Sequence, residues 1–124
     1  MERLKYLEQE KWKYPRVNVS INVDYTLRGD EVREGKAVTE NISTRGVCLL
    51  VYDRIEIGKE LDLKIYLPDE KNPLETKGKI VWQAKSPLNI NRNRLGIEFI
   101  EINDKDRERI VHYLCSLGKE VCAS

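Results

Sequence analysis

The stretch from Asn41 to Gly46 reads N-x-S-x-x-G and offers polar groups that suit a nucleotide. An Asn side chain has both a hydrogen-bond donor and an acceptor, and a Ser side chain adds a hydroxyl. Asn41 and Ser43 point the same way if the preceding strand continues that far, because they are two residues apart. Gly46 permits a sharp turn and a close approach of the ligand. Ordinary loops between strands have the same composition, so the stretch alone is a weak signal.

A basic segment lies upstream of this stretch. Residues 11–16, Lys-Trp-Lys-Tyr-Pro-Arg, carry three positive charges and no negative charge. The guanidinium fork of Arg16 can bind phosphate or the O6/N7 edge of guanine, and Lys11 and Lys13 add point charges. Trp12 has a flat face on which a base can stack. The alternative is a solvated basic arm in which Trp12 packs on the rest of the domain.

The elements that must position these residues are β-strands. From residue 17 to residue 27 apolar and polar side chains alternate strictly, which predicts a strand with one buried face. A turn follows in which Gly29 is expected to supply a positive φ. The alternation and the turn residues predict further strands at about 34–42, 46–51, 60–67, 74–83 and 94–100, with a polar loop over 84–93. Six strands with turns at this density predict a sandwich or a barrel.

The C-terminal part is predicted to be helical. Asn103 can cap the start of a helix, and Asp104 and Asp106 suit its first turn. Gly118 is expected to end the helix early. One apolar stripe is formed by Ile110, Leu114, Leu117 and Val121. A single amphipathic helix beside a barrel most simply covers it or plugs it.

Composition excludes most other functions. The chain has 124 residues, about one domain, and its 22 basic and 21 acidic residues leave a net charge of +1. This balance argues against a binder of DNA or RNA, including single strands. The one histidine, His112, is expected to be a partly exposed helix residue, so a multi-histidine metal site is excluded. No catalytic motif occurs, and we expect neither an enzyme nor a metal or cofactor.

The three cysteines, Cys48, Cys115 and Cys122, fit no zinc pattern. Cys48 lies in the apolar run 47–51 and is expected to be a small core residue. We expect no signal peptide, because the N-terminal residues contain no apolar core, and no apolar run approaches the ~18 residues of a membrane span. We therefore expect reduced thiols in a soluble cytoplasmic protein without a membrane span.

Taken together, the basic segment and N-x-S-x-x-G resemble the PilZ domain. Two further pieces carry the resemblance, Gly78–Trp82 and Arg94–Ile100 with the following 106–110, and it covers roughly residues 11–117. The resemblance implies an all-β fold, a six-stranded antiparallel β-barrel with a C-terminal helix, over residues 16–124. It also implies a basic arm at 1–15 and a ligand, the bacterial second messenger cyclic di-GMP.

The resemblance extends to the ligand-binding residues. The second motif of the family is D/N-x-S-x-x-G, and the stretch 41–46 matches all of its fixed positions. The first motif is R-x-x-x-R, of which Arg16 matches the last arginine, whereas Trp12 stands where the first arginine would be. The ligand-binding residues that the resemblance predicts are Lys11, Trp12, Lys13, Arg16, Asn41, Ser43, Arg45 and Gly46.

The departure at Trp12 leaves two functions open. An indole can stack on a base but cannot neutralise phosphate, and loss of a charge-assisted contact costs about 1.5–3 kcal/mol, or roughly a 10- to 150-fold loss of affinity. The first function is a cyclic di-GMP receptor whose arm 1–15 orders on the ligand and signals to a protein partner in motility, pilus or exopolysaccharide (biofilm) machinery. The alternative is a degenerate PilZ adaptor that binds no nucleotide and acts through protein–protein contacts.

Overall fold

The computed structural model describes residues 16–29, 32–68, 70–89 and 91–118. Within these ranges all the predicted strands and the predicted helix form. The elements are β1 (Val17–Asn18), β2 (Asn22–Leu27), β3 (Arg33–Ile42), β4 (Gly46–Val51), β5 (Glu60–Ile65), β6 (Leu74–Lys85), β7 (Asn93–Glu101) and α2 (Asp104–Ser116).

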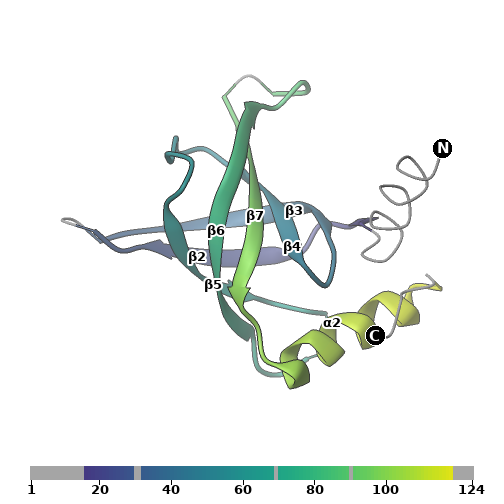
Figure 1. The fold of residues 1–124 in the computed structure, drawn as a ribbon. Helices are drawn as coiled ribbons and strands as arrows, with labels where there is room; N and C mark the ends of the chain where they lie inside the picture. Colours follow the sequence, from purple (N-terminus) through teal and green to yellow (C-terminus); the bar gives the residue numbers. More distant parts are fainter. Residues whose placement is uncertain (1–15, 30–31, 69, 90, 119–124) are drawn as a thin grey trace, which may run out of the picture.

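Six of the strands close into an antiparallel barrel (Figure 1). The order around the barrel is β3-β2-β5-β6-β7-β4, and β4 pairs back with β3. β1 is an additional short strand that pairs with the end of β3 beyond β2. The predicted six-stranded barrel with a C-terminal helix is therefore confirmed.

Alternation along the strands fills the barrel with aliphatic side chains. In β4, for example, Val47, Leu49 and Val51 are buried in one core cluster with residues of every other barrel strand. Successive side chains of a strand point to opposite faces, so the residues between them lie on the outer face of the barrel. The functional question is therefore which outer-face residues the pairing of the strands brings together.

A β-bulge splits the first predicted strand into β1 and β2. The three residues from Val19 to Ile21 oppose only two residues of β3, Thr39 and Glu40. The hydroxyl of Thr39 fills the gap, because it accepts a hydrogen bond from the backbone N–H of Ile21 at 2.9 Å and donates one to the carbonyl of Val19. The extra residue of a bulge interrupts the regular pairing of a strand, and this interruption could not be read from the alternating pattern.

The same region of β3 is also irregular toward β4. The pairing shifts between Thr39 and Asn41, so Glu40 has no direct partner on β4. Thr39 and Ile42 are both buried, and Glu40 and Asn41 between them are both partly exposed. Two consecutive side chains of β3 therefore lie on the outer face of the barrel.

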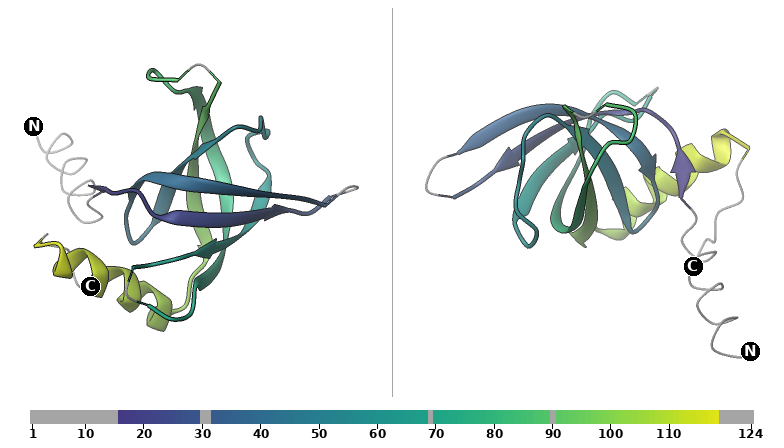
Figure 2. Two further views of the ribbon diagram at one scale, coloured as in Figure 1. Left: turned by 180° about the vertical axis from the view of Figure 1, so that it is seen from behind. Right: turned by 90° about the horizontal axis from the view of Figure 1, so that it is seen from above.

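The helix α2 packs across one end of the barrel (Figure 2). Asn103 caps it as predicted, because its Oδ1 accepts a hydrogen bond from the backbone N–H of Asp106 at 2.8 Å. Ile110 and Leu114 are buried in the barrel core, whereas Leu117 is 42 % exposed. Gly118 follows the helix with a left-handed φ of 79°, which confirms the predicted stop. Val121 lies outside the described residues.

Gly29 differs from its expectation. Gly58 and Gly118 are the described glycines with a positive φ, so the prediction of a positive φ at Gly29 is wrong. The turn residues 30–31 of this hairpin lie outside the described residues. In the described part of the chain no helix combines the length and the apolar character needed to cross a membrane.

Candidate functional site

Arg16 and Asn41 are in direct contact on the outer face of the barrel. Arg16 directly precedes β1, and Asn18 of β1 pairs with Asn41 of β3. Nη1 of Arg16 donates a hydrogen bond to Oδ1 of Asn41 at 2.8 Å. The fold thus joins the last residue of the basic segment to the first residue of N-x-S-x-x-G, although 25 positions separate them in the sequence.

Ser43 holds the turn between β3 and β4 together. β3 ends one residue earlier, at Ile42, and Ser43 is only 1 % exposed. Its Oγ accepts hydrogen bonds from the backbone N–H groups of Arg45 at 3.1 Å and Gly46 at 3.2 Å. The condition for Ser43 to point the same way as Asn41, a strand that continues to Ser43, is therefore not met. A direct contact between Ser43 and a ligand stays a prediction.

Gly46 is required by the neighbouring strand β7. A Cβ atom at this position would overlap the carbonyl oxygen of Ile97, and the φ of Gly46 is not left-handed. The carbonyl of Arg45 accepts a hydrogen bond from the backbone N–H of Phe99 at 2.9 Å, while the Arg45 side chain is exposed. The turn that carries the predicted ligand residues is thus fixed to β7 at two adjacent points.

A row of paired residues continues from Asn41 across the outer face. Asn41 pairs with Cys48 of β4, Cys48 with Gly96 of β7, and Gly96 with Trp82 of β6. A Cβ atom at Gly96 would overlap the five-membered ring of Trp82, so the indole lies over Gly96. The half-buried ring of Trp82 can therefore pack against the backbone only because Gly96 has no side chain. We refer to the outer-face residues gathered here as the Arg16–Trp82 face: Arg16, Glu40, Asn41, Cys48, Trp82, Arg94 and Gly96.

Arg94 lies above the middle of this face. Its guanidinium carbon is 5.4 Å from the centroid of the Trp82 ring, and its Nε donates a hydrogen bond to Oε2 of Glu40 at 2.9 Å. The side chains of Arg94 and Glu40 are 29 % and 36 % exposed, so their ion pair is partly shielded from water. Burial lowers the pKa of Arg94, but the hydrogen bond and charge of Glu40 outweigh burial and raise the pKa. A second guanidinium cation is thus held on the same face as Arg16.

Cys48 is buried under these polar residues. It is 0 % exposed, as expected, but its neighbours Val47 and Leu49 point into the barrel core, so Cys48 points outward. The prediction of a buried apolar position is confirmed, but Cys48 does not belong to the core cluster inside the barrel. A continuous apolar run hides the alternation where the outer face is also covered. Burial, and then the charge of Glu40, raise the pKa of the Cys48 thiol, whereas Arg94 acts in the opposite direction.

Five residues of the face were not among the predicted ligand residues: Glu40, Cys48, Trp82, Arg94 and Gly96. Trp82 and Arg94 belong to the sequence pieces that carried the resemblance, which was the available signal, but only the strand pairing shows that they lie close to Asn41. Lys11, Trp12 and Lys13, which were predicted, lie outside the described residues.

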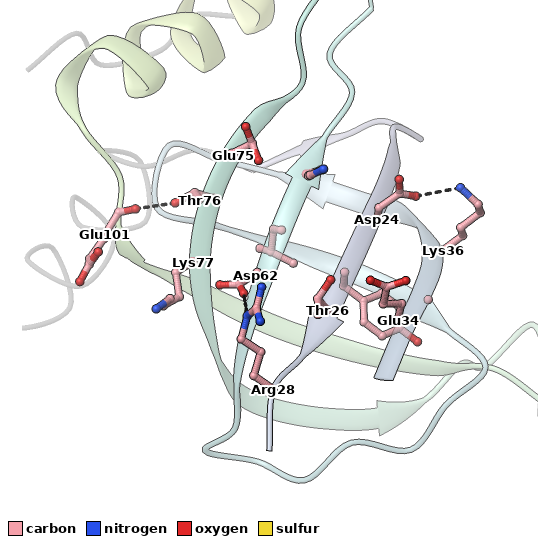
Figure 3. Close-up of a pocket in the computed structure, with 14 residues that line it drawn as sticks. Asp24, Thr26, Arg28, Glu34, Lys36, Asp62, Glu75, Thr76, Lys77 and Glu101 are labelled. Carbon is pink, nitrogen blue, oxygen red and sulfur yellow. Dashed lines mark hydrogen bonds and ion pairs between the residues drawn. The ribbon is translucent and has the colours of Figure 1, made fainter. Parts of the chain in front are cut away.

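A hollow of about 750 Å³ lies over the outer faces of β2, β3, β5 and β6 (Figure 3). Its wall mixes acidic and basic side chains, and two ion pairs cross it, Arg28 with Asp62 at 2.5 Å and Lys36 with Asp24 at 3.2 Å. The Tyr66 hydroxyl donates a hydrogen bond to Asp24, and this bond is the main cause that lowers the pKa of Asp24. None of the predicted ligand residues that the structure describes lines this hollow, and we interpret it as a solvated charged surface.

Comparison with known proteins agrees with the resemblance seen in the sequence. The model of the PilZ domain matches residues 10–116. The Bacillus subtilis inhibitor of motility, MotI/DgrA, is similar in structure with a TM-score of 0.71 and 24 % identity, over 87 % of this chain and 52 % of that protein. The PilZ domain of YcgR from Escherichia coli, solved with c-di-GMP, has a TM-score of 0.68 and 9 % identity, over 86 % of this chain and 90 % of that domain.

A third structure, the complex of K. pneumonia MrkH with c-di-GMP, has a TM-score of 0.66 and 14 % identity, over 85 % of this chain and 51 % of that protein. The chain thus spans about half the length of MotI/DgrA and of MrkH. At these identities the structures show the shared fold alone. No curated protein matches the chain.

Proposed function

Because the chain belongs to the PilZ domain family, whose members bind cyclic di-GMP, we propose that it is a cyclic di-GMP receptor. Domains of this family act as receptors rather than enzymes. The observation that carries the proposal is the contact of 2.8 Å between Arg16 and Asn41, which unites parts of both family motifs at one place on the barrel.

The Arg16–Trp82 face offers the chemistry that such a ligand requires. Cyclic di-GMP has two guanine bases and two phosphates. Arg16 is exposed and can place its guanidinium fork on a guanine edge or a phosphate. The Asn41 side chain adds an amide NH2 group, since its carbonyl oxygen is the atom that accepts the bond from Arg16.

Arg94 and Trp82 extend the same face. A guanidinium group that lies against an indole ring forms a flat, polarised surface on which a purine can stack. Arg94 also supplies a positive charge for a second anionic group of the ligand. In this proposal Arg16 and Arg94 share the charge that the family's first motif would otherwise provide with two arginines.

The arm 1–15 completes the site in the proposed receptor. Lys11 and Lys13 add positive charge, and Trp12 stacks on a base that Arg16 holds. Closure of the arm over the nucleotide changes the surface that a protein partner meets, and that change is the signal. Since MotI/DgrA is an inhibitor of motility, motility machinery is a candidate source of the partner, beside pilus and exopolysaccharide machinery.

The proposal is tested by Arg16→Ala and Asn41→Ala, each titrated with cyclic di-GMP by calorimetry. Arg16→Ala removes a charge-assisted contact and is expected to weaken binding about 10- to 150-fold. Lys105→Ala serves as the control, because it removes one positive charge from an exposed position of α2. If Arg16→Ala binds as tightly as the unmodified protein, with an unchanged circular dichroism spectrum, the assigned site is wrong.

A second candidate function is an adaptor that binds no nucleotide. Trp12 in place of arginine favours it, and so does the fact that Arg16 and Arg94 already contact Asn41 and Glu40. An adaptor would give no heat with cyclic di-GMP at two different temperatures. It would also capture the same partner with and without the nucleotide.

A further inference from the structure

The shift in the pairing of β3 with β4, between Thr39 and Asn41, is a β-bulge of β3. It places Glu40 beside the predicted ligand residue Asn41. Thr39 is buried, and strict alternation from there would turn Asn41 into the barrel and Ile42 out of it. The extra residue at the bulge reverses this, so that Asn41 lies outward and Ile42 is fully buried. The β-bulge that turns Asn41 outward therefore also leaves a carboxylate, that of Glu40, on the same side of the strand.

Glu40 forms an ion pair with Arg94, the cation that an anionic ligand would otherwise bind. Its Oε2 is 2.9 Å from Nε of Arg94, and in the described part of the chain this is the ion pair that either side chain makes. Nε is one of the two donors on an edge of the guanidinium group that can take a phosphate with two parallel hydrogen bonds. A carboxylate is the group that most resembles a phosphate in this position, since both accept the same fork.

The charge of Glu40 also opposes an anionic ligand directly. Because Glu40 is adjacent to Asn41, a phosphate that approaches Arg16 meets a negative charge next to the residue that Arg16 contacts. The pair with Arg94 is only partly shielded, with 29 % and 36 % of the side chains exposed. Each side chain can therefore turn to another partner in water without a large loss.

We propose that Glu40 is an internal competitor that sets the affinity of the Arg16–Trp82 face for the phosphate groups of its nucleotide. This inference rests on the proposed function, since it concerns the same face. Without ligand Glu40 holds Arg94 over Cys48 and Trp82, and the nucleotide must exchange that carboxylate for its own phosphate. Glu40 is thus a determinant of affinity that the family motifs do not contain.

The opposite role for Glu40 would be to position Arg94 for the ligand. The variant Glu40→Gln separates the two roles, because a glutamine keeps an oxygen that can accept the bond from Nε of Arg94 but carries no charge. A competitor predicts that Glu40→Gln binds cyclic di-GMP more tightly, by about two- to fivefold, the range expected for an ion pair of this exposure. If Glu40 positions Arg94 for the ligand, Glu40→Gln is expected to bind cyclic di-GMP equally or more weakly.

Glu98→Gln is the matched control. Glu98 is an exposed outer-face residue of β7 that pairs with Gly46 and makes no ion pair within the described residues, so its substitution changes the net charge equally. Calorimetry at low and moderate salt would compare the unmodified protein with both variants. Tighter binding by Glu40→Gln and unchanged binding by Glu98→Gln support the competitor. An equal gain in both variants means that only the overall charge matters, and it overturns the proposal.

The remaining outcomes separate this inference from the proposed function. If the unmodified protein binds cyclic di-GMP and Glu40→Gln binds no more tightly, the competitor is wrong while the receptor stands. If neither protein binds, the receptor itself is wrong, and the competitor fails with it. Titration of the Cys48 thiol checks that Arg94 stays in place in Glu40→Gln. Loss of the Glu40 charge lowers the pKa of this thiol as long as Arg94 remains beside it. Cys115→Ser and Cys122→Ser leave Cys48 as the one thiol for this titration.

Discussion

The Arg16–Trp82 face and the hollow in Figure 3 are both charged outer surfaces of one barrel, but they are built differently. In the hollow, acidic and basic side chains alternate along β2, β3, β5 and β6, and ion pairs neutralise charges across it. The Arg16–Trp82 face depends on a bulge, on two glycines that allow close packing, and on a buried thiol. A tightly packed glycine and a shift in pairing also occur at the hollow, at Gly35 against Tyr25 and between Lys77 and Gly78. The predicted ligand residues Arg16 and Asn41 lie on the Arg16–Trp82 face, and they indicate the site more strongly than volume does.

The largest expected effect is on nucleotide affinity. Arg94→Ala removes one of the two guanidinium groups of the Arg16–Trp82 face and leaves Glu40 without its partner. Affinity for cyclic di-GMP is expected to fall about 10- to 150-fold. Arg28→Ala, an arginine of the hollow, is expected to leave the affinity unchanged in the same calorimetric titration. Equal losses for the two variants would remove the distinction between the surfaces.

A second effect concerns stability. Gly46→Ala places a methyl group against the carbonyl oxygen of Ile97, so β4 and β7 must separate. We expect the free energy of unfolding to fall by about 1–3 kcal/mol, as for other overpacked positions. Gly29→Ala is the control, because nothing lies within 4 Å of a methyl group there and its φ is not positive. Urea denaturation followed by circular dichroism measures both, and a stable Gly46→Ala would contradict the close approach of β7.

The two surfaces also differ in their response to pH, and the Arg16–Trp82 face responds at alkaline pH. Burial raises the pKa of Cys48 above its ordinary value of 9.0, so the folded state favours the neutral thiol. The resulting stabilisation is present below that ordinary value and is lost as the pH rises through the raised pKa. The stability advantage of the unmodified protein over Cys48→Ala should therefore shrink between neutral pH and about pH 10. A constant difference would mean that the thiol is not shielded.

The smallest effect is at acid pH, in the hollow. The hydrogen bond from Tyr66 lowers the pKa of Asp24 below its ordinary value of 3.8. This stabilisation is present above the ordinary value and is lost as the pH falls through the lowered pKa. Tyr66→Phe should therefore make unfolding less sensitive to acid and leave nucleotide affinity unchanged. A change in nucleotide affinity for Tyr66→Phe would place the hollow in the binding site.

Much of the fold could be predicted from the sequence because the determining interactions are local. Alternating side chains predicted the barrel strands, and Asn103 and Gly118 predicted the ends of α2. The split of the first strand could not be predicted, because it depends on one hydroxyl, that of Thr39, which bonds to a strand about 20 positions away. The φ of Gly29 was predicted wrongly because a glycine in a turn does not always need a positive φ.

The candidate site was predictable only in part. Asn41 and Arg16 were found through motifs, and the structure brings them into contact. Trp82 and Arg94 were missed because their proximity to Asn41 depends on the pairing of strands that are distant in the sequence. Glu40 was missed because its place beside an outward-facing Asn41 depends on the irregular pairing of β3 with β4. Lys11, Trp12 and Lys13 stay predictions, because they lie outside the described residues. Direct ligand contacts of Ser43, Arg45 and Gly46 stay predictions as well.

The most direct test of the central claim is isothermal titration calorimetry of the purified chain with cyclic di-GMP, with GTP as the control ligand. The receptor predicts micromolar or tighter binding of cyclic di-GMP, and the stoichiometry would show how Trp12 is accommodated in place of an arginine. Absence of heat at two temperatures would contradict the receptor and favour an adaptor that acts through protein contacts alone.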